Sequence, residues 1–382
     1  MQKPVPEARD TSYKTAELVK LISDIGPDVP EISRRLGQFK ESVRYRYKEK
    51  VLGRGFSVHA LPNHEKLGLR RVALLLDFAP PYETYAHSIL SAMNELCYVV
   101  YFEKRMFRGD FLVEASVPAE HLVAFTNFML SLKDKGLLTA VDIQPFEWFR
   151  IVPMRAEAYD FDSGRWDFDW STLQKSSEEA GYRPGEKIKF DWEDLLILKE
   201  LQIDATRSFI EVAAKLKENY KKLSWHYKTH VLERELVNGY NLRWMGTSYS
   251  TVLEKALHRK HRYQHLAIMA LGLTEVERMD IMTKVHGVPF IWSEAVGVGS
   301  YAAHFYFPTE HITESFKFLT DAISSAREKA TVMALDQTEA LSFTISYQLF
   351  DDAKHAWTFD GAGLASRFDD LIQKIVEIGG TA

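Results

Sequence analysis

The chain has 382 residues, 46% of them hydrophobic, so it is long enough for about two to four domains with ordinary cores. Its formal net charge of −5 excludes a protein that is basic overall, and its single cysteine, Cys97, excludes an intramolecular disulfide and a cysteine-based zinc cluster. No apolar run approaches the roughly 20 residues that span a bilayer, so we expect a cytoplasmic protein without a membrane partner.

Three short helices are expected at the start of the chain. Apolar residues recur at helical spacing between residues 15 and 25, a second helix begins at Pro30, and a third covers about 40–52 before Gly53 and Gly55. Strands are expected over 56–61 and 72–78. Three helices and a strand pair predict a winged helix-turn-helix domain over 12–70.

The pattern then changes to strand, helix, strand, strand, helix, strand. This βαββαβ order predicts a ferredoxin-like sandwich over 71–150, with helices on one face of an antiparallel sheet. An acidic linker follows over 151–189, and four of its aromatic side chains suggest that it docks on the protein. They are Phe161, Trp166, Phe168 and Trp170.

The same order of elements then repeats. The stretch 45–52 (YRYKEKVL) returns as 225–232 (WHYKTHVL), 180 residues later, and 118–122 (PAEHL) returns as 308–312 (PTEHI), 190 residues later. Two matches in the same order indicate a tandem duplication, and the difference of ten residues fits an insertion. We predict a second winged helix-turn-helix over 190–247, a basic insertion over 248–262, a second sandwich over 263–350 and a tail helix within 351–382. The fold class is therefore α+β, a pseudo-dimer in one chain.

The sequence resembles the Lrp/AsnC (feast/famine) family of transcriptional regulators. The second half carries the family's opening pattern and its hydrophobic-glycine-tyrosine exit, and the first half carries its hinge at 62–69 (PNHEKLGL). The residues of the opening pattern and the exit are Asp191, Asp194, Ile197, Leu198, Leu201, Asp204, Ala205, Val212, Ala213, Leu216 and 236–240 (LVNGY). The resemblance implies pairing through the sandwiches, which two units in one chain can achieve internally, with further homo-oligomers left open.

The same resemblance implies a small-molecule effector, an amino acid or another metabolite, at the turn of each sandwich. The turn residues are Gly109, Asp110, Gly299 and Ser300. Both turns depart from the family's pattern, because the first lacks one of its two acidic residues and the second lacks both.

Positive charge gathers around the two third helices. Residues 31–71 hold eleven Lys/Arg against four Glu, and 207–262 hold twelve against five. An α-helix fits the major groove, where basic side chains hold phosphates or read base edges, so we predict binding of double-stranded DNA. The predicted DNA-binding residues are Lys40, Ser42, Arg44, Tyr45, Arg46, Lys48, Lys221, Lys222, Ser224, Trp225, His226 and Lys228. Because Arg46 is replaced by His226 in the second copy, the operator should be asymmetric.

DNA binding is favoured over metal binding and over enzyme activity. His226 and His230 stand four apart on a helix, as zinc ligands can, but no third ligand is evident, so no metal site is predicted. We predict a sequence-specific regulator that is not an enzyme, with no catalytic residue and no cofactor. One alternative is an enzyme like the siroheme decarboxylases, which resemble the same two-domain unit, although residues 56–61 and 240–245 do not clearly carry that family's basic and histidine-bearing wing pattern. Another is a ligand-sensing or interaction module that does not bind DNA.

Overall fold

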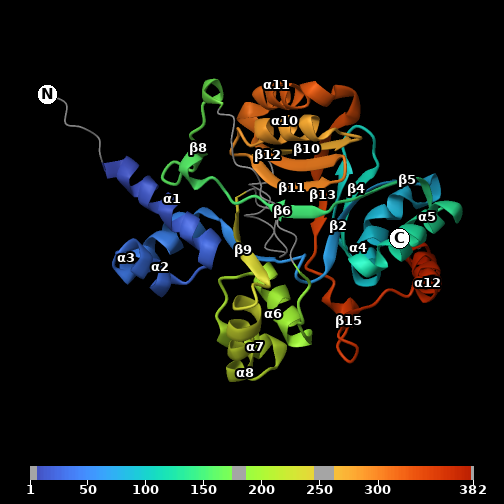
Figure 1. The fold of residues 1–382 in the computed structure, drawn as a ribbon, viewed down its shortest axis with the longest axis horizontal. Helices are drawn as coiled ribbons and strands as arrows, with labels where there is room; N and C mark the ends of the chain where they lie inside the picture. The colour runs from blue at the N-terminus through green and yellow to red at the C-terminus, as the bar shows by residue number, and fades with distance from the viewer. Residues whose placement is uncertain (1–6, 174–185, 245–261, 380–382) are drawn as a thin grey trace.

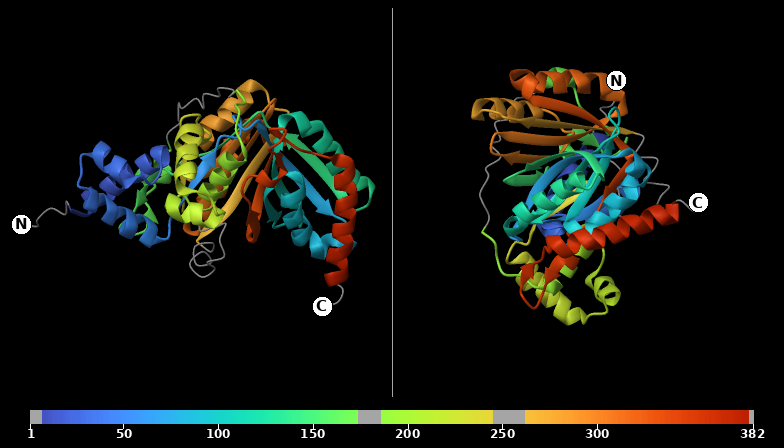
Figure 2. Two further views of the ribbon diagram at one scale, coloured as in Figure 1. Left: turned by 90° about the horizontal axis from the view of Figure 1, so that it is seen from below. Right: turned by 90° about the vertical axis from the view of Figure 1, so that its right-hand side faces the viewer.

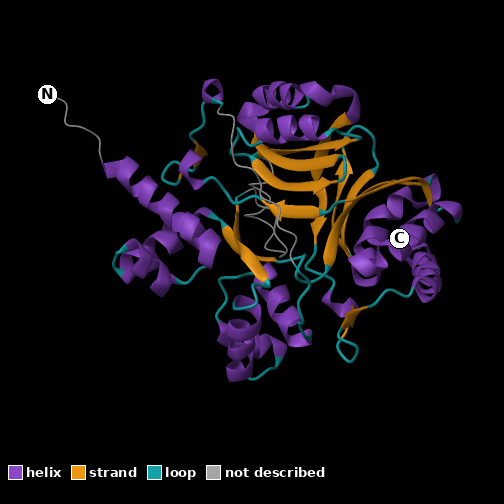
Figure 3. Ribbon diagram, viewed as in Figure 1, coloured by secondary structure: helices purple, strands orange, loops and turns teal. Residues whose placement is uncertain are grey.

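The computed structural model describes residues 7–173, 186–244 and 262–379. Two three-helix units lie outside a central sheet, and helices cover each half of that sheet (Figure 1). Figure 3 shows the strands gathered in the middle of the molecule, with helices on the outside. The fold is mixed helix and antiparallel sheet, so the predicted α+β class is confirmed. Most of the predicted basic insertion at 248–262 lies outside the described residues.

The first helical unit contains α1 (Glu7–Ile25), α2 (Val29–Leu36) and α3 (Lys40–Tyr45), and α3 continues through a π-helical turn over Arg46–Val51 and a 3-10 turn over Leu52–Arg54. Asp28 caps α2 by accepting from the backbone N–H of Glu31, and Gly37, with φ of 62°, ends it. The third helix and its continuation bury one apolar face, formed by Val43, Tyr47 and Val51. Figure 2 shows this unit at one end of the molecule.

The second helical unit has the same order: α6 (Trp192–Ile203), α7 (Phe209–Leu216) and α8 (Tyr220–His226), continued by a π-helical turn over Tyr227–Leu232. Capping boxes start two of its helices, formed by Asp191 with Asp194 at α6 and by Ser208 with Glu211 at α7.

The strands that follow the two helical units, which we call the wing strands, pair with each other. Strand β1 (Ser57–Pro62) belongs to the first half and β9 (Val237–Arg243) to the second, and they form an antiparallel two-stranded sheet with His59 opposite Asn241. We predicted that the strand after the first three helices would pair with the strand at 72–78, and that prediction is wrong. Helix α1 packs on β9 and α6 packs on β1, so each wing strand lies against the first helix of the other half.

The packing of α1 on β9 gives a stability prediction at Gly239. Its φ is 144°, and a Cβ there would lie 2.8 Å from the backbone carbonyl oxygen of Ser23 at the end of α1. Gly239→Ala should lower the free energy of unfolding by roughly 2–4 kcal/mol through backbone strain and overpacking. The matched control is Gly37→Ala, also at positive φ but with open space, which should cost about 1 kcal/mol. Urea unfolding measures both, and equal costs would refute the close approach.

Each half then contributes a βαββαβ run. The first has β2 (Leu69–Phe78), α4 (Ala86–Cys97), β3 (Val99–Arg105), β4 (Phe111–Pro118), α5 (Leu122–Asp134) and β5 (Leu138–Pro145). The second has β10 (Tyr263–Leu271), α10 (Glu275–Val285), β11 (Ile291–Gly297), β12 (Ser300–Pro308), α11 (Ile312–Ala322) and β13 (Ala330–Ser342). The element order of both sandwiches is the predicted one.

The two half-sheets join into one sheet of nine strands, in the order β5-β2-β4-β3-β13-β10-β12-β11-β6. The end of β13 pairs with β3 of the first half, and β6 (Trp148–Ile151) of the first half pairs with β11 of the second. Small and flexible apolar side chains from both halves fill a separate core: Ala73, Leu112, Phe146, Ala267, Met269, Ala295, Ala302, Met333 and Leu335. One chain thus contains both members of the pair.

The linker docks where it is described, as its aromatic residues predicted. Residues 151–173 include β7 (Tyr159–Asp160) and β8 (Arg165–Trp166). Trp166 packs edge-on against Trp244 and Phe290, and Phe168 and Trp170 also contact Phe290. Near the other end of the chain lie β14 (Phe350–Asp351), β15 (Ala356–Trp357) and the predicted tail helix, α12 (Gly361–Gly379), which packs on α4 and α5. None of the described helices is both long and apolar enough to cross a membrane.

Candidate active site

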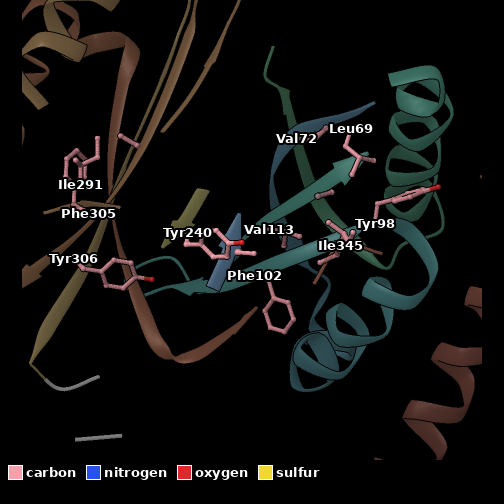
Figure 4. Close-up of a cluster of buried hydrophobic side chains, with 14 of the residues drawn as sticks. Leu69, Val72, Tyr98, Phe102, Val113, Tyr240, Ile291, Phe305, Tyr306 and Ile345 are labelled. Atoms are coloured by element: carbon pink, nitrogen blue, oxygen red, sulfur yellow. The ribbon is translucent and has the colours of Figure 1, made fainter. Parts of the chain in front are cut away.

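A cavity of about 780 Å³ lies where the wing strands meet the central sheet. Its walls come from both halves: β1 and β9, the start of β2, strand β6, and the facing positions of β4, β10 and β12. This volume falls within the roughly 300–1,000 Å³ of small-molecule sites. Figure 4 shows buried apolar residues of the second half (Ile291, Phe305, Tyr306) on one side, of the first half (including Leu69 and Val72) on the other, and Tyr240 of β9 between them.

Unlike most of the core, the cavity is lined by polar and charged groups. Its titratable lining residues include His59, His64, Lys66, Arg70, Arg71, Tyr101, Glu114, Arg150, Arg243, His265, His304 and Tyr306. Asp24, Glu65, Glu147 and Glu235 also line it, so five Lys/Arg side chains are matched by five Asp/Glu, and four histidines complete the set.

A chain of buried polar groups runs between the halves. The Nε2 of His304 lies 3.1 Å from Glu114 Oε1, and its Nδ1 lies 3.0 Å from His265 Nε2. The other nitrogen of His265 contacts Glu103, which also accepts from the Tyr101 hydroxyl. Tyr306 stacks on the His265 ring at 4.2 Å. Such a chain can hold and pass a proton beside the cavity.

Equivalent positions of the two halves supply unlike groups to this chain. Strand pairing places Arg71 and Glu114 at the positions that His265 and His304 occupy in the second half. Burial would raise the pKa of Glu114, but Arg71 at 3.4 Å and His304 outweigh it and lower the pKa to about 2. Glu114 is therefore a carboxylate at neutral pH.

Two further histidines are held neutral. Burial, with Arg243 nearby, lowers the pKa of His59 to about 3, and its ring nitrogens lie 2.7 Å from the Gln202 carbonyl oxygen and from Ser57 Oγ. Burial and Arg71 lower the pKa of His64 to about 3. Neutral imidazole is the form that binds metal ions or accepts a proton.

The cavity also contains a polar side chain without a protein partner. Asn241, on β9, is 1% exposed, and its amide oxygen and nitrogen make no hydrogen bond to any described residue. A buried amide that lacks hydrogen bonds lowers folding stability by about 1–3 kcal/mol. A polar ligand that forms hydrogen bonds to the amide can restore this free energy.

The residues predicted to bind DNA lie elsewhere. Those exposed on the third helices are Lys40, Ser42, Arg44, Tyr45, Lys48, Lys221, Lys222, Trp225 and Lys228. Arg46 and Ser224 are half-buried, and Arg46 donates to Gln38 Oε1 at 2.6 Å. His226 is buried and faces Asp194.

The residues predicted to bind an effector also lie outside the cavity. Gly109, Asp110 and Gly299 lie between paired strands, Ser300 begins β12, and none of the four lines the cavity. Asp110 is buried against Arg105, and Ser300 accepts from Gln144 at 3.1 Å.

Neither a known family model nor a curated protein matches the sequence. The solved structure of siroheme decarboxylase NirDL matches 96% of this chain and 99% of its own, with a TM-score of 0.51 and 10% identity. A second NirDL structure, in complex with an iron-uroporphyrin III analogue, matches 88% of this chain and 94% of its own, with a TM-score of 0.51 and 11% identity. The likeness is one of fold.

Regulators of the AsnC family match only part of the chain. A transcriptional regulatory protein from Pyrococcus furiosus matches 35% of this chain and 86% of its own chain, with a TM-score of 0.26 and 15% identity. The prediction that the chain is not an enzyme is wrong, because NirDL, which matches along nearly the whole length, is an enzyme.

Proposed function

We propose that the chain is an enzyme that binds an iron tetrapyrrole bearing carboxylates, siroheme or a close analogue, and decarboxylates it. The observation that carries this proposal is the large cavity lined by arginines and histidines from both halves. The full-length likeness to siroheme decarboxylase NirDL supports it, since a fold of the same extent holds an iron-uroporphyrin analogue in that protein.

The cavity is suited to the carboxylates of such a ring. Arg150 of β6 and Arg243 of β9 line it, and Lys66 and Arg70 lie near the start of β2. Guanidinium groups bind carboxylates through two parallel hydrogen bonds, and these bonds are stronger in a site shielded from water. Arg150 is itself oriented by Glu294, which accepts from its Nε at 2.6 Å.

His64 is the candidate to face the iron of the substrate. Its low pKa keeps the imidazole neutral, and its Nδ1 lies 3.2 Å from Ser116 Oγ, which leaves Nε2 as the ligating atom. Both nitrogens of His59 already contact protein oxygens.

Decarboxylation breaks the bond between a carboxylate carbon and its methylene carbon. Carbon dioxide leaves, the electron pair stays on the methylene carbon, and one proton adds there. The adjoining cationic groups would stabilise the developing charge, and the His265–His304 pair would supply the proton. No oxidant or reductant is needed for this balance.

The test is anaerobic incubation of the full-length protein with siroheme. We expect a shift of the tetrapyrrole absorption spectrum on binding and, by mass spectrometry, products lighter by one carbon dioxide for each carboxylate removed. A protein that leaves the spectra of siroheme and of an iron-uroporphyrin unchanged at micromolar concentrations would refute the proposal.

The exposed basic face of the third helices supports duplex DNA binding as a second candidate function. Lys40, Arg44 and Lys48 project from α3 and its continuation without being buried. Replacing all three by alanine should lower the salt dependence of DNA binding by about three units, roughly one for each phosphate that is no longer neutralised. Fluorescence anisotropy with genomic fragments at several salt concentrations measures this, and a wild-type protein that binds no duplex at low salt would exclude it.

A further inference from the structure

The second helical unit brings two histidines and two aspartates to one point. His226 ends α8, His230 lies one turn later, and Asp191 and Asp194 form the capping box of α6. One possible ligand atom from each residue lies within 4.8 Å of all the others. The sequence offered only the histidine pair, and the fold adds the two carboxylates from more than thirty residues earlier.

The distances between these atoms fit a metal ion at their centre. His226 Nδ1 lies 3.4 Å from Asp194 Oδ1 and 3.7 Å from Asp191 Oδ1. His230 Nδ1 lies 3.2 Å from Asp194 Oδ1 and 3.5 Å from Asp191 Oδ2. Tetrahedral zinc with nitrogen and oxygen ligands at about 2.0–2.1 Å has ligand atoms roughly 3.3–3.4 Å apart, and the four distances bracket that value.

The surroundings favour a cation. The Asp194 side chain is fully buried, and His226 is nearly so. A divalent ion would balance both carboxylates while the histidines bind it as neutral imidazoles.

We propose that Asp191, Asp194, His226 and His230 form a structural site for a divalent transition metal, with zinc the best fit. Four protein ligands close the coordination sphere and leave no position for a reacting molecule. None of the four lines the cavity, so the site is independent of the proposed enzymatic function. Its role is to fasten the start of α6 to the end of α8.

The duplication provides an internal comparison. At the same positions 180 residues earlier, Arg46 and Lys50 replace His226 and His230. Arg46 bonds to Gln38, and Lys50 pairs with Asp162 at 2.6 Å. Two cations cannot bind a metal, so we expect one zinc ion per chain and not two.

The test uses the full-length protein, stripped with a chelator and titrated with zinc against a chromophoric competitor. We expect one tightly bound ion. His230→Gln should weaken binding by at least roughly 100-fold, since the loss of even an outer-shell partner costs 10–100-fold. The control His355→Asn removes an exposed histidine at positive φ, which asparagine tolerates, and should bind zinc as the wild type does.

A second variant separates loss of ligation from loss of folding. His230→Cys keeps a zinc ligand, so it should retain tight binding and, loaded with Co²⁺, should add a sulfur-to-metal charge-transfer band to the visible bands of tetrahedral cobalt. A wild-type chain that binds no zinc at micromolar concentrations would overturn the proposal. Equal zinc affinity in the wild type and His230→Gln would overturn it as well.

Discussion

Replacement of His265 by glutamine is expected to lower the rate of siroheme decarboxylation by roughly 10²–10⁴-fold, the usual contribution of a positioned acid or base. His265 lies between Glu103 and His304 in the buried chain, so its removal disconnects Glu103 and Tyr101 from His304. Tetrapyrrole affinity should change by only a few-fold, because the cationic groups proposed to hold the carboxylates remain. Single-turnover kinetics and equilibrium titration separate the two quantities.

The control for His265→Gln is His121→Gln. His121 is half-buried and its Nε2 lies 2.9 Å from the carbonyl oxygen of Trp357, but it does not line the cavity. Both variants should lose stability, and only His265→Gln should lose turnover. Turnover within threefold of the wild type in His265→Gln would show that the chain of polar groups is structural.

Acid should destabilise the protein well above the pH at which carboxylates titrate. His59 and His64 have pKa values of about 3 in the folded chain against 6.5 for the free side chain. Between these values the unfolded chain binds two protons that the folded chain does not, so stability is complete above about pH 6.5 and falls as the pH decreases toward 3. Each histidine contributes about 1.4 kcal/mol per pH unit.

Urea unfolding at pH 7.5, 6.5 and 5.5 tests this dependence in a range where most carboxylates are ionised in both states. The wild type should lose roughly 2.7 kcal/mol per pH unit near the acid end, and His265, whose pKa burial also lowers, adds to the same trend. His59→Gln and His64→Gln should each reduce the slope by about 1.4 kcal/mol per pH unit. Unchanged slopes in both variants would mean that neither histidine is held neutral by the fold.

Much of the fold was predictable because its determinants are local. Helical spacing, the stop at Gly53 and Gly55 and the repeated 118–122 and 308–312 stretches indicated the order of elements in both halves. Strand partners were harder to predict. A strand such as β1 can pair with either of two edges, and the choice of β9 depends on packing against α6 and α1, which are far apart in sequence.

The candidate active site was missed, although a signal was present. His59, Glu114, His265 and His304 each interrupt an apolar strand, and a charged or imidazole group in a buried strand needs a partner. The two expected wing segments did contain His59 and Arg243. The cavity wall that these residues share forms only when β1 pairs with β9, which the sequence does not indicate. The recognition-helix interpretation emphasised exposed charge and so overlooked these inward residues.

The fusion of two unlike halves around one cavity has an evolutionary consequence. In a dimer of identical subunits, every substitution in the cavity would appear twice, in two equivalent sites. Here Arg71 and Glu114 face His265 and His304 across a single fused pair, so each wall can change without altering its counterpart. Fusion also fixes the ratio of the two unlike walls at one to one, whatever the concentration of the protein, and makes their joining a folding step within a single chain.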